Sequence, residues 1–220
     1  MFDAVIFDMD GLMIDTEKVW ERSKRTACRR LNIPFSAEFD NLTRATSGTT
    51  FARLVEEHFS SIGYPGIDGQ AFLNEVWSLS DEAFEQRVDK KPSLDELIVW
   101  LNEKGIARAI ASASTIAQIK HHLSMIGWSD AFTMIISGFD LERAKPAPDI
   151  FLKAADRLGA DPARTVVLED SPNGIRAAAA GGFIPIMVPD RESPEQVNGL
   201  YRHVCANLLE VRDLLASGNV

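Results

Sequence analysis

Short, uninterrupted apolar runs recur along the chain, and small or acidic residues follow most of them. Runs of this length with no polar interruption are typical of strands that are buried on both faces, as in a parallel sheet. Pro185 lies inside the fifth run and places that strand toward the edge of the sheet, because proline cannot donate to a central ladder. The runs cover residues 4–7, 107–111, 134–136, 166–168 and 184–188, with a weaker sixth candidate at 203–206.

Helical patterns separate these runs from residue 93 onward, and each pattern ends close to a glycine. Ser93 and Glu96 have the spacing of a capping box, and Gly105 stands where a C-terminal cap is expected. The alternation of helix and strand predicts an α/β fold, a doubly wound, Rossmann-like domain with a parallel sheet. The apolar stripes that predict these helices cover residues 94–101, 116–126 and 150–158.

The segment between the first two apolar runs breaks this alternation. It contains helix-like stretches and a loop signal at 63–66, but no convincing buried strand. We therefore expect an all-helical cap domain, residues 16–88, inserted into a core domain made of residues 1–15 and 89–220. The stretches that predict its helices are 16–31, 50–59 and 70–86.

Composition and charge narrow the class of protein. The chain has 220 residues, 45% hydrophobic, with a formal net charge of -9. An acidic chain lacks the basic face of a nucleic-acid binder and is not attracted to anionic lipid, so neither nucleic acid nor a membrane is expected as a partner. No export signal or long apolar segment is present, and the two cysteines, Cys28 and Cys205, form no disulfide framework. These features predict a cytoplasmic protein, a monomer or weak homodimer.

Paired carboxylates follow two of the predicted strands. Asp8 and Asp10 follow the first apolar run, and Glu169 and Asp170 follow the fourth. The carboxyl ends of parallel strands lie at one edge of a sheet, so we expect all four carboxyl groups around one cation. Two carboxylates ~4 Å apart repel by about 4 kcal/mol at an effective dielectric near 20, and a cation relieves that repulsion. Oxygen ligands without neighbouring His or Cys favour Mg²⁺. Taken alone, either pair is equally well explained as helix caps or turn residues.

Two further loops supply groups that bind an anion. Ser112, Ala113 and Ser114 end the second run with hydroxyls and with backbone N–H groups that we expect to be open to an anion. Lys145 places a cation just before a helix, in a loop stiffened by two prolines. Together with the acids, these groups describe a site for a phosphoryl group and Mg²⁺.

The ordered set of motifs resembles the haloacid dehalogenase-like superfamily. Residues 8–12 (Asp-Met-Asp-Gly-Leu) look like its first motif, Ser112 like the second, Lys145 like the third, and residues 169–174 like the fourth. The helical insertion resembles the cap of the β-phosphoglucomutase-like branch. Dehalogenases of the superfamily lack the second aspartate of the first motif, so Asp10 indicates phosphoryl transfer.

The resemblance implies a role for each of these residues. Asp8 would attack phosphorus and form an aspartyl-phosphate, and Asp10 would protonate the leaving oxygen and then take a proton from water. Lys145 and Ser112 would hold phosphoryl oxygens, with help from the backbone amides near Ala113 and Ser114. The implied Mg²⁺ ligands are the Asp8 side chain, the Asp10 backbone carbonyl and Asp170, with Glu169 as a further or outer ligand.

The implied function is a Mg²⁺-dependent phosphatase of a small phosphorylated metabolite, a sugar phosphate or a nucleoside monophosphate. One alternative is a phosphomutase, whose relatives carry a Gly-x-Ser-Arg stretch in the cap and a lysine after the second motif. This chain has Phe51 in place of that arginine, with Arg53 two residues later, and Thr115 in place of that lysine. A binding or regulatory protein without turnover is the other alternative. Thr16, Trp20, Thr49, Thr50 and Arg53 are the cap residues expected to contact the leaving group.

Overall fold

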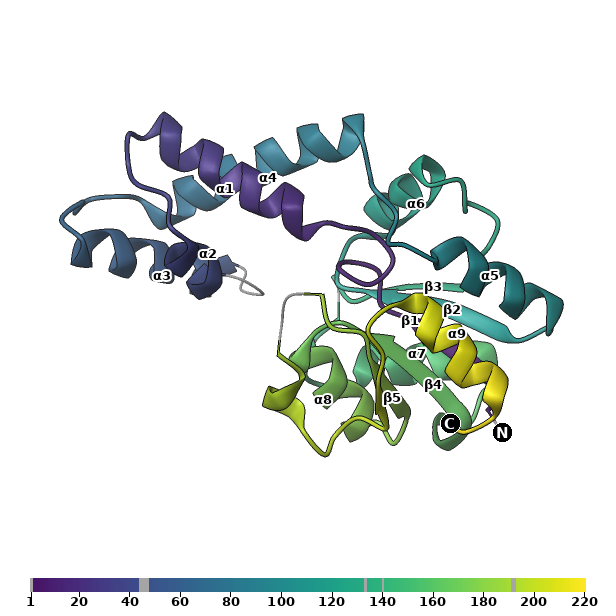
Figure 1. The fold of residues 1–220 in the computed structure, drawn as a ribbon. Coiled ribbons are helices and arrows are strands. Elements are labelled where there is room, and N and C mark those ends of the chain that lie inside the picture. Colours follow the sequence, from purple (N-terminus) through teal and green to yellow (C-terminus); the bar gives the residue numbers. More distant parts are fainter. Residues whose placement is uncertain (1, 44–47, 133, 140, 191–192) are drawn as a thin grey trace. The chain divides into compact units, whose positions relative to one another are not determined.

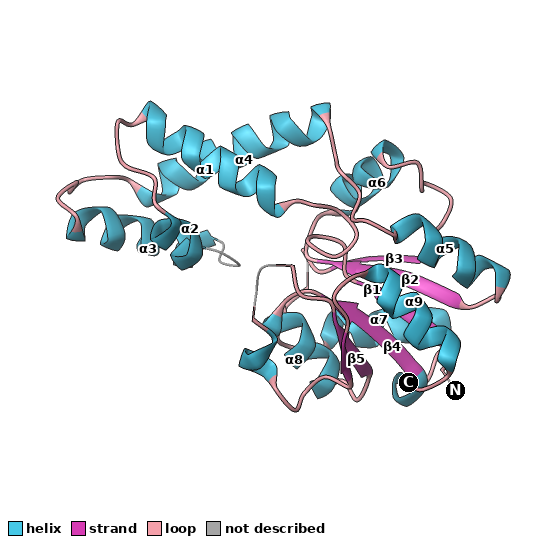
Figure 2. Cartoon of the chain, in the orientation of Figure 1, coloured by secondary structure: helices cyan, strands magenta, loops and turns pink. Residues whose placement is uncertain are grey.

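The computed structural model describes residues 2–43, 48–132, 134–139, 141–190 and 193–220 (Figure 1). The chain divides into two compact units. Met1–Asp15 together with Val88–Val220 form the first, called here the core unit, and Thr16–Arg87 form the second, called the helical unit. Figure 2 shows strands in the core unit and helices throughout the described part of the helical unit.

A six-stranded parallel sheet forms the centre of the core unit, in the order β3-β2-β1-β4-β5-β6. The chain first moves outward from β1 to β2 and β3, then returns to β4 on the other side of β1. The prediction of a doubly wound parallel α/β fold is confirmed. The strands are β1 (Ala4–Phe7), β2 (Ala107–Ser112), β3 (Met134–Ser137), β4 (Thr165–Glu169), β5 (Ile184–Met187) and β6 (His203–Val204).

Side chains alternate across β1 and supply both helical layers of the core unit. Val5 and Phe7 join a cluster with the apolar faces of α5, α6 and α9, whereas Ile6 joins the cluster of α7 and α8 (Figure 1). Such burial on both sides explains why the run is continuous rather than alternating. The helices are α5 (Leu94–Glu103), α6 (Ile116–Met125), α7 (Asp149–Leu158), α8 (Pro172–Ala180) and α9 (Leu208–Ser217), with short 3₁₀ turns at Pro162–Arg164 and Pro194–Val197.

The predicted capping box at Ser93 is wrong. Ser93 has φ of 64° and makes no side-chain capping bond to α5. A capping box forms instead at Thr115 and Gln118, where the threonine hydroxyl accepts from the Gln118 N–H and the glutamine side chain accepts from Thr115 N–H. Ser93 has a left-handed backbone in place of the extended one typical of N-cap residues, and the residue spacing does not reveal this.

The helical unit has its own apolar centre, built on aromatic rings. Phe39, Phe59 and Phe72 are fully buried and pack ring against ring at centroid distances of 4.8–6.1 Å. Phe39 lies on a helix that the apolar pattern did not predict. The helices are α1 (Glu17–Arg30), α2 (Ala37–Thr43), α3 (Gly48–Ser61) and α4 (Gly69–Gln86).

A buried ion pair joins α1 to α2. Lys24 Nζ lies 2.5 Å from Asp40 Oδ1, and only 5% and 8% of the two side chains are exposed. The ammonium group also donates to the backbone carbonyl of Asp40 and to the hydroxyl of Thr43. Lys24 is therefore a buried charge, although it lies in the charged stretch 22–30.

Replacing Lys24 by methionine should lower the free energy of unfolding of the helical unit by about 3–5 kcal/mol, because it leaves the Asp40 carboxylate buried without its cation. The double variant Lys24→Met with Asp40→Leu should recover most of that loss. Urea unfolding followed by circular dichroism measures both. Equal stability of Lys24→Met and the unchanged protein would contradict the assigned importance of the pair.

Both cysteines are free and buried, one in each unit. Burial raises the pKa of the Cys28 thiol to about 12, and burial together with Glu210 raises that of Cys205 to about 11. Because the thiolate is the reactive form, native labelling is slowed by protonation as well as by burial.

Iodoacetamide at pH 8 should label native Cys205 at least ~100-fold more slowly than unfolded Cys205, because its pKa lies about two pH units above the ordinary value of 9.0. Native Cys28 should react more slowly still. Variants Cys28→Ala and Cys205→Ala assign the labelled thiol by mass spectrometry, and urea should make both thiols reactive. Fast labelling of either thiol without denaturant would show that its unit opens far more readily than its packing implies.

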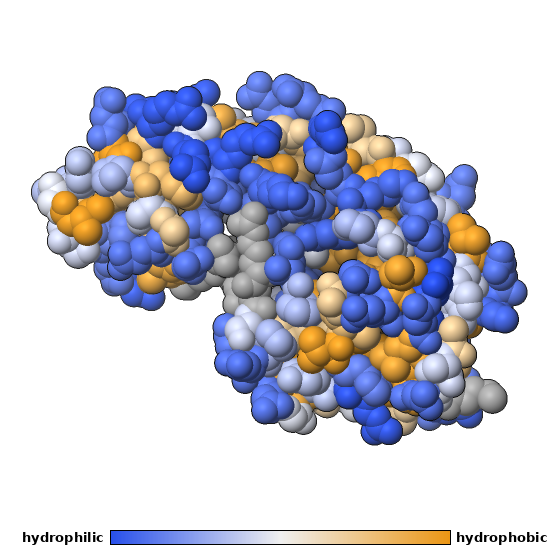
Figure 3. Space-filling model, viewed as in Figure 1, coloured by the Kyte–Doolittle hydropathy of each residue, from blue (hydrophilic) through white to orange (hydrophobic). Residues whose placement is uncertain are grey.

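Polar side chains predominate on the face of the molecule shown in Figure 3, with apolar ones scattered among them. Within the described ranges, no helix combines the length and the apolar character needed to cross a membrane.

Candidate active site

Asp8, the first carboxylate of the site, directly follows strand β1. Phe7 of β1 pairs with Leu168 of β4, and the next N–H, that of Asp8, donates to the Leu168 carbonyl at 3.0 Å. Asp8 therefore lies beside Glu169, the last residue of β4. The order of strands reverses between β1 and β4, and open α/β sheets bind ligands at such a point.

Three carboxylates converge at this sheet edge. Oxygens of Asp8, Glu169 and Asp170 lie within 4.8 Å of one another, and Asp8 and Glu169 are buried. All three offer hard oxygen ligands without imidazole or thiolate, which is the donor set that Mg²⁺ prefers. The residues present therefore fit a divalent cation.

Lys145 lies between two of these carboxylates. Its ammonium group is 2.6 Å from Asp8 Oδ1 and 2.5 Å from Glu169 Oε1. It also donates to the Ala111 carbonyl at the end of β2, and it lies 4.8 Å from the ring centroid of Phe151 on α7. Contacts from β1, β2, β4 and α7 thus fix the cation over the carboxyl ends of the central strands.

The charges at this edge do not balance. Burial raises the pKa of Asp8 to about 8, with smaller upward effects of Glu169 and Asp10 and an opposing effect of Lys145. Burial, followed by Asp8 and Glu169, also holds the pKa of Asp170 well above its ordinary value. Burial would lower the pKa of Lys145, but the two adjacent carboxylates raise it overall. One ammonium group is too little for this cluster, and a divalent cation would supply the missing positive charge.

The carboxylate of Asp10 contacts two serines of the loop after β2. Its Oδ2 accepts hydrogen bonds from the hydroxyls of Ser112, at 2.9 Å, and Ser114, at 3.0 Å. The carboxylate cluster described above has three members, and Asp10 is not one of them, so a fourth carboxyl group at the cation stays a prediction. The Ser114 N–H, expected to be open to an anion, donates to Ser112 Oγ at 3.0 Å. No such contact is seen for Ala113, which lies between the two serines.

Two glycines leave space for the acidic side chains. A Cβ on Gly174, in the first turn of α8, would lie 1.8 Å from the Glu169 carboxyl carbon. A Cβ on Gly11, whose φ is +84°, would lie 2.2 Å from Asp170 Oδ2. The Ser171 hydroxyl and N–H both donate to Glu169 Oε2, so that this side chain is held at both oxygens. The backbone at these positions is therefore part of the site.

Sequence reasoning missed one acidic residue at this edge. Asp190 raises the pKa of Asp170, and its Oδ1 lies 2.6 Å from the ammonium group of Lys91. It follows the fifth apolar run just as Asp8 follows the first. The same argument from strand ends, applied to residues 184–188, would have found it.

Thr16 and Trp20, two of the expected substrate contacts, lie at the start of the helical unit. Thr16 is the N-cap residue of α1, is buried, and accepts at its carbonyl from the N–H groups of Val19 and Trp20. The Trp20 ring packs edge-on against Phe84 of α4 at 6.1 Å. Both residues therefore have a part in the packing of this unit.

The remaining expected contacts lie on α3. Thr49 is exposed, and the placement of the Thr50 side chain lies outside the described part of the structure. Arg53 is exposed and pairs with Glu57, one turn later, at 2.8 Å. These side chains stay as predicted substrate contacts.

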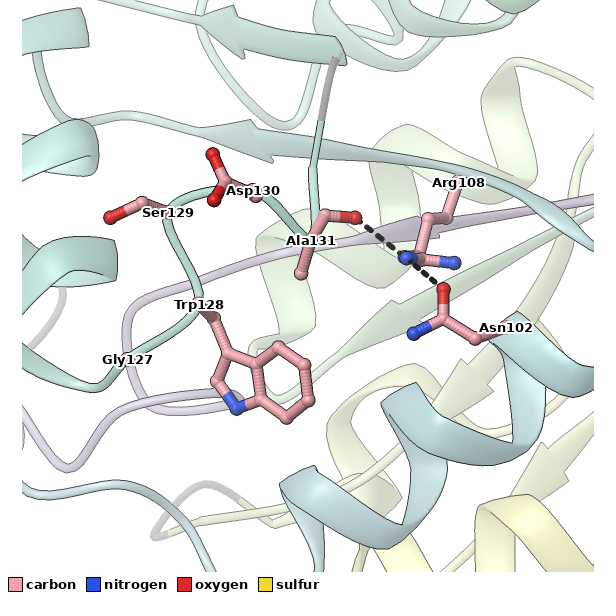
Figure 4. Close-up of a pocket in the computed structure, with 7 residues that line it drawn as sticks. All are labelled: Asn102, Arg108, Gly127, Trp128, Ser129, Asp130 and Ala131. Carbon is pink, nitrogen blue, oxygen red and sulfur yellow. Dashed lines mark hydrogen bonds between the residues drawn. The ribbon is translucent and has the colours of Figure 1, made fainter.

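A separate pocket lies along the loop between α6 and β3 (Figure 4). Arg108 donates to the Ala131 carbonyl at 2.9 Å and to the Asn102 side chain at 2.6 Å. None of the described residues of the acidic site lines this pocket. We therefore place the chemistry at the strand ends and not here. Its lining residues are Asn102, Arg108, Gly127, Trp128, Ser129, Asp130 and Ala131.

Comparison with known proteins agrees with the geometry. A model of the haloacid dehalogenase-like hydrolase family matches residues 2–182, a range that includes all four motifs. The chain belongs to the haloacid dehalogenase-like hydrolase family. The resemblance drawn from the motifs is confirmed.

Curated relatives in this family extend over most of the chain. Hexitol phosphatase B of Escherichia coli O157:H7 is 32% identical over 219 residues, 96% of each chain. Fructose-1-phosphate phosphatase YqaB of Escherichia coli K12 is 27% identical and covers 83% of this chain and 94% of its own. The predicted class of enzyme, a phosphoric monoester hydrolase, is confirmed by these phosphatase relatives.

A solved structure extends the likeness to the whole fold. The β-phosphoglucomutase of Clostridium difficile superposes with a TM-score of 0.75 at 21% identity, covering 100% of this chain and 98% of its own. At this identity the comparison supports the fold, a Rossmann-like core with helices, and leaves the reaction to be argued from the site.

Proposed function

We propose that the protein is a Mg²⁺-dependent phosphatase of a small phosphorylated carbohydrate. The observation that carries the proposal is the position of Lys145 between Asp8 and Glu169, beside Asp170, at the reversal point of the sheet. This cluster has the groups that phosphoryl transfer requires: a nucleophile, a fixed cation and ligands for a metal. The names of hexitol phosphatase B and fructose-1-phosphate phosphatase, two relatives of this chain, support a sugar or hexitol phosphate as the substrate class.

Asp8 acts as the nucleophile in this proposal. An oxygen of its carboxylate bonds to phosphorus while the bond from phosphorus to the leaving oxygen breaks, and Asp10 gives its proton to that oxygen. A water then attacks the aspartyl-phosphate, Asp10 takes the proton of that water, and phosphate leaves with Asp8 restored. The ammonium group of Lys145, 2.6 Å from Asp8, offsets the repulsion between the two anions.

Mg²⁺ held by Asp8, Asp170 and the Asp10 carbonyl would neutralise charge on the phosphoryl oxygens. Glu169 takes part as a further or outer ligand, since both its oxygens already contact the chain. Ser112 and the backbone amides of Ala113 and Ser114 would bind phosphoryl oxygens. For this the Ser112 hydroxyl has to turn away from Asp10, to which it donates here, and the Ser114 N–H has to turn away from Ser112 Oγ.

Features of both units favour hydrolysis over the phosphomutase alternative. Phe51 stands in the place of the mutase arginine, and it is buried in the apolar centre of the helical unit. The guanidinium of Arg53 is already paired with Glu57. Thr115 stands where the mutase lysine is expected, and its side chain caps α6. A second phosphate would have to be bound by other groups.

A phosphate-release assay tests the proposal. The panel consists of hexitol phosphates, fructose 1-phosphate, β-glucose 1-phosphate, nucleoside monophosphates and phosphoglycolate, each with Mg²⁺ and with EDTA. We expect Mg²⁺-dependent release of phosphate with a preference for the carbohydrate esters. Formation of glucose 6-phosphate from β-glucose 1-phosphate would establish the mutase instead. Binding of phosphate and Mg²⁺ without turnover on any compound would support the binding or regulatory alternative.

We place the reaction in the cytoplasm and its substrate among small metabolites, with the enzyme acting as a monomer or weak homodimer. The predicted cap domain, residues 16–88, is proposed to select the leaving group. Thr16, Trp20, Thr49, Thr50 and Arg53 remain its proposed contacts.

A further inference from the structure

The side chain of Asp10 is held by two serines of the loop after β2. Oδ2 accepts from Ser112 Oγ at 2.9 Å and from Ser114 Oγ at 3.0 Å, and the Ser114 N–H donates to Ser112 Oγ. Each carboxyl oxygen has two lone pairs, so Oδ2 is fully occupied as an acceptor. The two serines together therefore fix the orientation of the Asp10 carboxyl group in this arrangement.

The two serines have different tasks when a phosphoryl group is bound. Ser112 has one O–H, and in the proposed function that group donates to a phosphoryl oxygen, which withdraws it from Asp10. The hydroxyl of Ser114 then remains on Oδ2. Ser114 is thus the serine whose contact with Asp10 lasts through the reaction.

The backbone of Ser114 is in turn fixed from the neighbouring strand. Ser137, the last residue of β3, donates its hydroxyl to the Ser114 carbonyl at 2.7 Å and accepts from the Phe139 N–H at 3.1 Å. The Gly138 N–H donates to the Ser112 carbonyl at 2.8 Å, so that the end of β3 holds the loop at both serines. Ser137 thus reaches Asp10 through Ser114.

We propose that Ser114, fixed by Ser137, is the positioning residue for the Asp10 carboxyl group. The inference rests on the proposed function, in which Asp10 protonates the leaving oxygen. The structural basis of the positioning role is the series of hydrogen bonds from Ser137 at the end of β3, through Ser114, to Oδ2 of Asp10. When the Ser114 hydroxyl is removed, Asp10 is still present, but its side chain is free to rotate away from the leaving oxygen.

The test uses the dependence of the rate on the leaving group. A sugar phosphate has a poor leaving group that needs a proton, whereas p-nitrophenyl phosphate has a good one that does not. Because general acid catalysis contributes ~10²–10⁴-fold, Ser114→Ala should lower the ratio of kcat for the sugar phosphate to kcat for the aryl phosphate by at least about 10-fold. Ser137→Ala should lower the ratio in the same direction by less, and Ser114→Thr should restore it.

Two reference variants separate this inference from the proposed function. Asp10→Asn should lower the same ratio more than Ser114→Ala does, and Ser124→Ala, which removes an exposed hydroxyl on α6, should leave both rates unchanged. If Asp10→Asn lowers the ratio and Ser114→Ala lowers both rates equally, the positioning role is wrong while the proposed function stands. If Asp10→Asn itself lowers both rates equally, Asp10 is not the proton donor, and both its role in the proposed mechanism and the positioning role of Ser114 are overturned.

Discussion

Asp8→Asn should abolish turnover, lowering kcat by at least about 10⁴-fold, as expected when a covalent nucleophile is removed. Asparagine keeps the shape of the side chain but offers no anionic oxygen to phosphorus. Steady-state phosphate release with the best carbohydrate ester of the panel measures the loss. A single-turnover experiment with acid quench should detect a phosphorylated protein in the unchanged enzyme and none in the variant.

The same substitution should leave the fold intact. Burial raises the pKa of Asp8 to about 8, from 3.8, so the metal-free folded protein already favours a neutral group at this position. A group with a raised folded pKa contributes stability below its unfolded pKa and loses that contribution as the pH rises through its folded pKa. In EDTA, the unfolding free energy of the unchanged protein should therefore fall between about pH 4 and pH 8. The fall should be smaller in Asp8→Asn.

Urea unfolding in EDTA across this pH range provides the control for the activity loss. An inactive variant with the stability of the unchanged protein supports loss of the nucleophile. Turnover of Asp8→Asn within about 100-fold of the unchanged enzyme would contradict the assigned role, because a second nucleophile would then have to be present.

The strands and the acidic edge could be predicted because their signals are local. β1 is continuous and apolar since its side chains are buried in both helical layers, and Asp8 follows at once. The topology of a parallel sheet then brings Glu169 beside it without any knowledge of the contacts. Motifs at strand ends are therefore the part of this site that a sequence reveals most directly.

Features that depend on contacts between distant segments could not be predicted. Lys24 looks like one more charge on a helix face, and only the packing of α2 against α1 buries it beside Asp40. Ser93 has the spacing of a cap, but its left-handed backbone excludes that role. The direction of the Asp10 side chain is likewise set by the hydroxyl groups of a loop 102 residues away or more.

Substitution of Gly174 should lower the catalytic rate, although this residue has no side chain of its own at the site. A methyl group there would lie 1.8 Å from the Glu169 carboxyl carbon, and that carboxylate is fully buried and held by Lys145 and Ser171. Gly174→Ala therefore has to displace Glu169 or α8. A misplacement of about 1 Å costs about 10²-fold in rate, so we expect kcat to fall by about that factor.

A double-mutant cycle distinguishes this clash from a general weakening of α8. Gly174→Ala should lower the unfolding free energy by about 1–3 kcal/mol in the unchanged protein, as overpacking of a buried site does. In a Glu169→Ala background the Glu169 carboxyl group is absent, so Gly174→Ala should change the unfolding free energy little or raise it. Alanine has a higher helix propensity than glycine. Equal costs in both backgrounds would show that the methyl group meets something other than Glu169. A restored stability without restored turnover is the expected result, because Glu169 then no longer holds Lys145 beside the nucleophile.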